Sequence, residues 1–185
     1  MEEKGAAEAA AMSGGEAGAE ASAGMKVAVA VDASEESLHA LAWALDNIVV
    51  RRGVSSLVIV HAQPGADHYV YPVAAHGIAI AYAPAAAIES MRKAQDEISR
   101  KVVSRALDAC KQREASVNAT GAILEGDAKE AICQAVEEMH ADLLVLGSRG
   151  LGKIKRAFLG SVSDYLVHHA CCPVLVVKPS KAHDK

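Results

Sequence analysis

The sequence predicts an α/β fold, a single doubly wound domain in which a parallel sheet carries helices on both faces. From Met25 onward, short apolar runs alternate with longer amphipathic segments, a pattern typical of βαβ units. Right-handed crossovers place the helices of such units on both faces of the sheet. Aromatic residues make up only 3% of the 185-residue chain, so we expect a core of aliphatic side chains.

Residues 1–24 differ in composition from the rest of the chain. They contain nine Ala, five Gly and five Glu but no Val, Ile or Leu. Such a segment cannot bury enough apolar surface to offset the entropy of ordering. We therefore expect a disordered acidic tail at 1–24, one domain at 25–179 and a short C-terminal tail at 180–185.

The first half of this domain predicts a strand, a helix and a second strand. The run 26–31 is apolar and β-branched, as in a buried parallel strand, and Ser34 is a suitable N-cap for the next helix. The apolar residues of that helix recur at helical spacing and are Leu38, Leu41, Leu45 and Ile48. A second strand is expected at 56–61. Residues 62–88 are too long for an ordinary connection, so we interpret them as a loop insertion.

The second half predicts a long helix and then three strands and two helices. The long helix spans about 88–113, and its expected core residues are Met91, Ile98, Val102, Ala106 and Cys110. Gly126 and Asp127 open the next helix. The residues of that helix expected to face the core are Ala131, Ile132, Ala135, Val136 and Met139. The remaining strands are expected at 117–124, 142–146 and 174–177, and the last helix at about 161–170.

Charge and hydropathy exclude two classes of partner. The net charge of −4 lies within residues 1–24, which hold five Glu and one Lys, so residues 25–185 are formally neutral. A neutral domain lacks the electrostatic footprint of nucleic-acid binding. No apolar run is long enough for a transmembrane helix, and the acidic N-terminal segment lacks secretory and transit signals. We expect no nucleic-acid or membrane partner and a cytoplasmic location, with the nucleus as the alternative.

The four cysteines indicate thiols rather than a redox or metal site. Cys110, Cys133, Cys171 and Cys172 show no CxxC spacing, and adjacent cysteines have poor geometry for pairing with each other. We assign them neither a disulfide nor a metal.

A glycine-rich loop near the C-terminus predicts a phosphate site. Gly147 and Gly150 follow an apolar strand, and Gly160-Ser161 precede a helix. Glycines allow backbone N–H groups to approach an anion, and a helix N-terminus supplies unsatisfied donors and a positive dipole end. The nearby basic residues either neutralise phosphates or form a solvated surface, and they are Arg149, Lys153, Lys155, Arg156 and Lys178.

Two common phosphate motifs do not fit this loop. Gly152-Lys153 is followed by Ile154 rather than Ser or Thr, which excludes a P-loop. The first strand ends in Val31-Asp32 without a glycine, which argues against the dinucleotide fingerprint.

The motifs that are present resemble those of the universal stress protein family, in its nucleotide-binding branch. The loop gives Gly147-x2-Gly150-x9-Gly160-Ser161 without a gap. The matching regions elsewhere are Val31-Asp32-x-Ser34, Val60-His61, Gly126-Asp127-Ala128 and Cys172-Pro173-Val174-Leu175-Val176-Val177. The resemblance implies a Rossmann-like, adenine nucleotide alpha hydrolase-like fold with a five-stranded parallel sheet in the order 3-2-1-4-5.

The resemblance also implies a cofactor and its ligands. The cofactor is ATP or AMP, with Mg²⁺ held through the phosphates. The residues implied for the base and ribose are Val31, Asp32, Ala33, Ala62 (through its backbone), Leu146 and Gly147. Those implied for the phosphates are Gly150, Gly160, Ser161, Val162 and Ser163. Two alternatives stay open, namely that Asp32 acts as a turn residue with Ser34 and that Ser161 serves as an N-cap.

Three functions follow as hypotheses. The first is an ATP-binding regulatory protein that acts as a stress-responsive switch, and the resemblance adds a homodimer formed through the last strand, 174–177. The second is a slow ATP hydrolase or phosphotransferase, for which we assign no catalytic residue. The third is a chaperone-like or scaffold dimer whose nucleotide is structural. We interpret His61 as a structural residue at a strand end rather than a catalyst.

Overall fold

The computed structural model describes residues 24–52, 54–65, 85–113, 117–148 and 159–179. Outside the described residues therefore lie residues 1–23 of the predicted N-terminal tail, the C-terminal tail, most of the 62–88 insertion, Gly150 and the basic residues at 149–156. Within them, five parallel strands form one sheet in the order β3-β2-β1-β4-β5, which confirms the predicted fold. The strands are β1 (Met25–Ala30), β2 (Val54–Gln63), β3 (Ala119–Glu125), β4 (Leu143–Gly147) and β5 (Val174–Val177).

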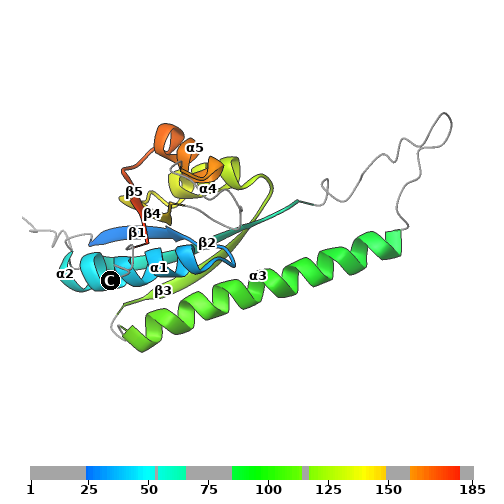
Figure 1. Ribbon diagram of the computed structural model, residues 1–185, viewed down its shortest axis with the longest axis horizontal. Helices are drawn as coiled ribbons and strands as arrows, with labels where there is room; N and C mark the ends of the chain where they lie inside the picture. The colour runs from blue at the N-terminus through cyan, green and yellow to red at the C-terminus, as the bar shows by residue number, and fades with distance from the viewer. Residues whose placement is uncertain (1–23, 53, 66–84, 114–116, 149–158, 180–185) are drawn as a thin grey trace, which may run out of the picture.

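Helices cover both faces of the sheet (Figure 1). One face carries α1 (Glu35–Ala44) and α3 (Ala85–Arg113), and the other carries α4 (Ala128–Glu138) and α5 (Ser161–His169). After α1 the chain continues through one π-helical stretch, η1 (Leu45–Val49), and the short α2 (Val50–Arg52). Two cores result, one on each face, because residues alternate between faces along every strand.

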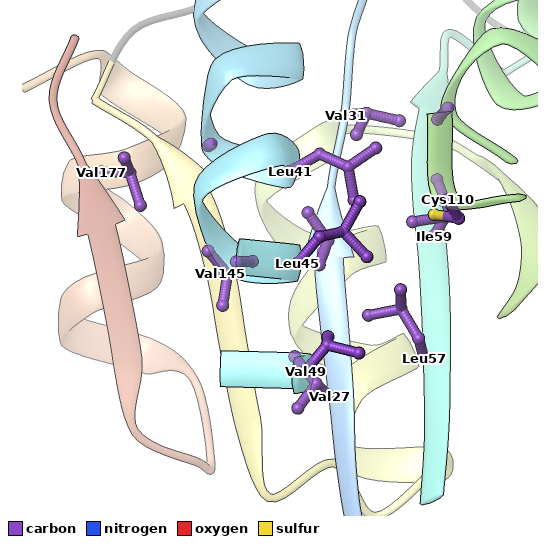
Figure 2. Close-up of a cluster of buried hydrophobic side chains, with 14 of the residues drawn as sticks. Val27, Val31, Leu41, Leu45, Val49, Leu57, Ile59, Cys110, Val145 and Val177 are labelled. Atoms are coloured by element: carbon purple, nitrogen blue, oxygen red, sulfur yellow. The ribbon is translucent and has the colours of Figure 1, made fainter. Parts of the chain in front are cut away.

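The core beneath α1 is built from aliphatic side chains, as the composition predicted. Figure 2 shows Leu41 of α1 and Leu45 just after it lying over the sheet, among Val27, Val145 and Ile59. All five are fully buried, and each buried Leu, Ile or Val stabilises the fold by about 1.5–3 kcal/mol. The expected helix residues Leu38 and Ile48 are only half-buried, because Ala40, Ala44 and Val49 share the face that meets the sheet.

Helix α3 differs from its predicted packing at its N-terminal end. Val102, Ala106 and Cys110 are buried as expected, but Met91 and Ile98 are each 50% exposed, so their assignment to the core was wrong. For Met91 the reason is the length of the sheet. Gln63, the last residue of β2, lies against Asp96, and the N-terminal turns of α3 extend past the sheet (Figure 1). Ile98 follows Asp96, and there the neighbouring Ser99 takes the buried position on the helix.

The two helices that follow β1 and β3 begin as the sequence predicted. Ser34 caps α1 and accepts a hydrogen bond from the Ser37 N–H, and Asp127 caps α4 and accepts from the Lys129 N–H. Gly126 precedes this second cap with a φ of +125°, a conformation that glycine adopts readily and residues with a Cβ do not. These caps satisfy backbone donors that a helix start leaves unpaired.

All four cysteines are thiols. Cys110 is buried under α3, and desolvation raises the pKa of its thiol to about 11. Burial likewise raises the pKa of Cys133 and of Cys172, with the neighbouring Cys171 adding to both shifts. These three thiols are therefore protonated at neutral pH. Of the helices that the structure describes, none combines the length and the apolar character needed to cross a membrane.

Candidate functional site

The sheet topology brings the predicted site residues to one edge. β1 pairs with β2 on one side and with β4 on the other, all in parallel, so their carboxyl ends meet. The chain winds from β1 toward β3 in one direction and from β4 to β5 in the other. This reversal beside β1 is the topological switch point at which open α/β sheets bind ligands.

Helix α5 starts at this edge without a side-chain cap. Its N-cap is Gly160, which makes no capping hydrogen bond, whereas α1 and α4 are capped by Ser34 and Asp127. The Asp164 N–H donates to the Gly160 carbonyl at 2.8 Å, so intrahelical bonding begins there. The N–H groups of residues 161–163 lie in the first turn, where no intrahelical acceptor exists. They form a set of donors suited to an anion.

Two hydrogen bonds attach the start of α5 to the end of β4. The Gly160 N–H donates to the Ser148 carbonyl at 2.9 Å, and the buried Ser163 hydroxyl donates to the Gly147 carbonyl at 2.9 Å. Ser148 is itself held by its N–H, which donates to the Val177 carbonyl of β5. We call the first two contacts the β4–α5 clamp. The Ser163 hydroxyl is buried and its hydrogen is used in the clamp, whereas Ser161 is exposed. Ser161 is therefore the residue of this turn whose hydroxyl can reach a ligand.

The turn after β1 is fixed by a second group of hydrogen bonds. The Asp32 carboxylate accepts from the Ser34 N–H at 3.0 Å and from the Ser34 hydroxyl. The Ser37 hydroxyl accepts from the Asp32 N–H at 3.2 Å and lies 3.0 Å from the carbonyls of Asp32 and Ser34. Asp32 thus does act as a turn residue with Ser34. Its contact with a ligand stays a prediction.

His61 holds the same turn from the neighbouring strand. Its Nδ1 lies 2.8 Å from the carbonyl oxygen of Val31, and the residue is 7% exposed. Because a carbonyl oxygen only accepts, Nδ1 carries the hydrogen of this bond. This contact agrees with the interpretation of His61 as a structural strand-end residue.

Burial decides how the other predicted residues can act. The side chains of Val31 and Leu146 are buried in the two cores, which leaves their backbone groups for any ligand. Gly147 is buried, and Ala62 is half-buried in β2 between His61 and Gln63. The exposed side chains of the set are Ala33 and Ser161, and Val162 packs partly against the second core. Gly150 lies outside the described residues.

Two residues of this edge were missing from the sequence prediction. Ser37 orders the Asp32 turn, and Ser148 receives the Gly160 N–H. Ser37 could have been recognised as a polar residue three positions after an N-cap and on the apolar face of its helix. Ser148 acts through its carbonyl, which any residue supplies. Over the described ranges, no three His, Cys, Asp or Glu residues form a group that could hold a metal ion.

Comparison with known proteins agrees with this architecture. Residues 25–178 match the family model described as the universal stress protein family. The chain is 34% identical over 171 residues to universal stress protein PHOS34 of Arabidopsis thaliana, and the aligned region covers 85% of the chain and 63% of PHOS34. It is 30% identical over 153 residues to universal stress protein YxiE of Bacillus subtilis, and here the aligned region covers 83% of the chain and 98% of YxiE. The chain thus spans less than two thirds of PHOS34 and nearly all of YxiE.

A solved structure shares both fold and sequence with the chain. It is a universal stress protein family protein from Arabidopsis thaliana with AMP bound, and it is 27% identical with a TM-score of 0.56. The match covers 85% of this chain and 97% of that protein. From the family model, the relatives and the sheet order together, the chain is a member of the universal stress protein family.

Proposed function

We propose that the chain binds an adenine nucleotide, AMP or ATP, across the carboxyl ends of β1 and β4. The observation that carries this proposal is the uncapped start of α5, clamped to the end of β4 beside the glycine motif. The AMP that is bound to the 27% identical Arabidopsis protein supports the same class of ligand. The unpaired N–H groups of the first α5 turn fit the charge and geometry of phosphate oxygens.

The proposed roles combine the family resemblance with the position of each residue. The N–H groups of Ser161, Val162 and Ser163 and the Ser161 hydroxyl hold the phosphates. Asp32, at the end of β1, lies on the base and ribose side, together with the backbone of Ala62. Mg²⁺, where ATP is bound, is held through the phosphates. These groups hold and orient a nucleotide. Together with membership of the universal stress protein family, they support a stress-responsive regulatory switch, with slow hydrolysis and a structural nucleotide as the alternatives.

Ligand release and calorimetry test this function. The purified protein is denatured, the released small molecules are identified by mass spectrometry, and nucleotide-free protein is titrated with ATP, AMP and GTP. At a ligand concentration 100 times Kd, binding stabilises the folded state by about 2.7 kcal/mol. For a domain of this size, that raises Tm by about 5–10 °C. Absence of released adenine nucleotide, with no heat and no Tm shift for ATP or AMP, refutes the proposal.

We further propose that β5 pairs with β5 of a second copy. β5 is an edge strand of the sheet, and its residues Val174, Leu175 and Val176 are only half-buried in the single chain. Exposed apolar edges are sites at which strands pair between chains.

The Val176→Pro variant is expected to convert this dimer to a monomer. The Leu144 N–H donates to the Pro173 carbonyl and the Ser148 N–H to the Val177 carbonyl. Since bonding alternates along a parallel strand, the Val176 N–H faces the open edge. Proline removes that donor and leaves the bonds to β4 in place. Sedimentation velocity measures the change, and Val176→Ala, which keeps the N–H, serves as the control. A dimer that persists in Val176→Pro contradicts the edge pairing.

A further inference from the structure

The last three residues of β2 connect the proposed nucleotide site to two other parts of the fold. They are His61, Ala62 and Gln63, and alternation along the strand turns the side chains of His61 and Gln63 to the α3 face. Both are buried, with exposures of 7% and 4%. Ala62, between them, is the residue proposed to meet the base through its backbone. The position of this backbone therefore depends on what its two neighbours contact.

His61 ties β2 to the turn after β1. Its Nδ1–H donates to the Val31 carbonyl at 2.8 Å, one residue before Asp32. The Ser37 hydroxyl meets the other side of this turn at the backbone of Asp32. The peptide that leads into Asp32 is thus fixed from β2 as well as from α1.

Gln63 ties the same strand end to α3 and to the turn before α4. Its Nε2 donates to Asp96 Oδ1 at 2.8 Å, and its backbone carbonyl accepts from the Gly126 N–H at 2.9 Å. Within the described residues, His61 Nε2 and Gln63 Oε1 are buried without a hydrogen-bond partner. Each side chain is therefore held by one specific contact, and removing that contact frees it.

Helix α3 reaches from this contact to a part of the surface far from the core. The turns before Asp96 lie past the sheet (Figure 1), with Met91 half-exposed among them. Asp96 is the contact that joins this part of α3 to Gln63. Two peptide units separate Gln63 from His61, which contacts the turn before Asp32.

We propose that His61 and Gln63 are positioning residues that set nucleotide affinity, and that α3 acts on the nucleotide site through Asp96. The inference rests on the proposed function, since it concerns the affinity of that same site. His61 and Gln63 act through the backbone of Val31 and Ala62 and need no contact with the ligand themselves.

A pair of His61 variants tests the first part. In His61→Asn the side-chain N–H₂ is bonded to Cγ, as Nδ1 is in histidine, so it can still donate to Val31. In His61→Gln the N–H₂ is one atom further out and corresponds to Nε2. Because one hydrogen bond contributes about 0.5–1.5 kcal/mol, we expect His61→Gln to weaken AMP and ATP binding about two- to tenfold. We expect His61→Asn to bind close to wild type.

Variants of Asp96 test the second part. Asp96→Ala removes the acceptor for Gln63 and is expected to weaken AMP binding by a similar factor. Asp96→Asn keeps an oxygen acceptor and should restore the affinity. Glu97→Ala is the matched control, because Glu97 is adjacent on α3 but pairs only with the exposed Lys101 in the described contacts. In the double variant Gln63→Met/Asp96→Ala the loss should equal that of either single variant, since both remove the same bond.

The readouts separate positioning from general stability. Tm is measured without nucleotide, affinity by calorimetry with AMP, and the His61 tautomer by ¹⁵N NMR, which should show a protonated Nδ1. A wild-type protein that binds neither AMP nor ATP refutes the proposed function and this inference together. If the wild-type protein binds AMP, and His61→Gln and Asp96→Ala bind it with the same affinity as the wild type, this inference alone is overturned. If His61→Gln does not fold, the Asp96→Ala and Asp96→Asn pair decides the outcome.

Discussion

Replacing Gly160 with aspartate is expected to stabilise the nucleotide-free protein and to abolish phosphate binding. Gly160 has φ −62° and ψ 151°, close to the values of Asp127 (−67° and 128°) and Ser34 (−81° and 152°), which cap α4 and α1. An aspartate therefore fits the backbone and supplies the cap that α5 lacks. The gain is about 0.5–1 kcal/mol, from the cap and from the negative charge at the helix start.

The carboxylate introduced at position 160 also competes with a phosphate for the backbone N–H donors at the start of α5. It accepts from the first-turn N–H groups and adds like-charge repulsion, which costs several kcal/mol, so affinity should fall by about 100-fold or more. Gly160→Asn is the matched control, because asparagine caps a helix about as well but carries no charge. It should raise Tm similarly and weaken binding less.

Calorimetry with ATP and thermal unfolding without nucleotide measure the two effects. The expected result is a Tm that rises by about 1–4 °C while binding is lost. A Gly160→Asp protein that binds ATP as well as wild type would show that the phosphates do not lie at the start of α5. A lower Tm would show that residue 160 does not act as a cap.

Gly121→Ala is expected to destabilise the fold strongly, although it adds only one methyl group. A Cβ at this position in β3 would lie 2.3 Å from Val103 Cγ1 and 3.4 Å from Leu107 Cδ1 of α3. Valine is short, and Val103 is buried, so its methyl group cannot move aside without displacing the helix. Overpacking of this kind costs about 1–3 kcal/mol, which lowers Tm by about 3–10 °C.

The double variant Gly121→Ala/Val103→Ala isolates the cause. Shortening Val103 removes the methyl group that the new Cβ meets, so the double variant should be more stable than the sum of the two single losses predicts. Urea unfolding of the wild type, both single variants and the double variant measures this coupling. Additive losses would mean that the helix and the strand do not meet at this point.

The strands and the parallel sheet could be predicted because each strand is a short apolar run and the runs alternate with helices, whereas the strand order followed from the family resemblance. Helical periodicity failed at Met91 of α3, because helical spacing identifies one face of a helix but carries no information on where the sheet beneath it ends. At Ile98 it failed because the neighbouring polar residue Ser99 is the one that is buried. In α1 the failure had another origin, since Ala40 and Ala44 occupy the buried face. Beside the leucines of this helix, these two alanines gave too weak an apolar signal to mark the buried face.

The candidate site was predictable where a residue acts locally. Ser34 and Asp127 cap the helices that follow them, and both were recognisable from their position before an apolar periodic segment. The contacts of His61 with Val31 and of Gln63 with Asp96 join residues about 30 positions apart. No local pattern encodes such pairs, because they depend on which strands become neighbours.

The β4–α5 clamp has a consequence for how this protein can diversify. Ser148 and Gly160 are hydrogen-bonded to each other, so the fold itself closes the loop between them. Doubling the length of a closed loop costs only about 0.6 kcal/mol. A change in the length of the segment between these two residues therefore costs the fold little, while the phosphate donors of α5 stay where they are. Its composition is limited instead by the ligand, because Gly150, one of the residues implied for the phosphates, belongs to this segment.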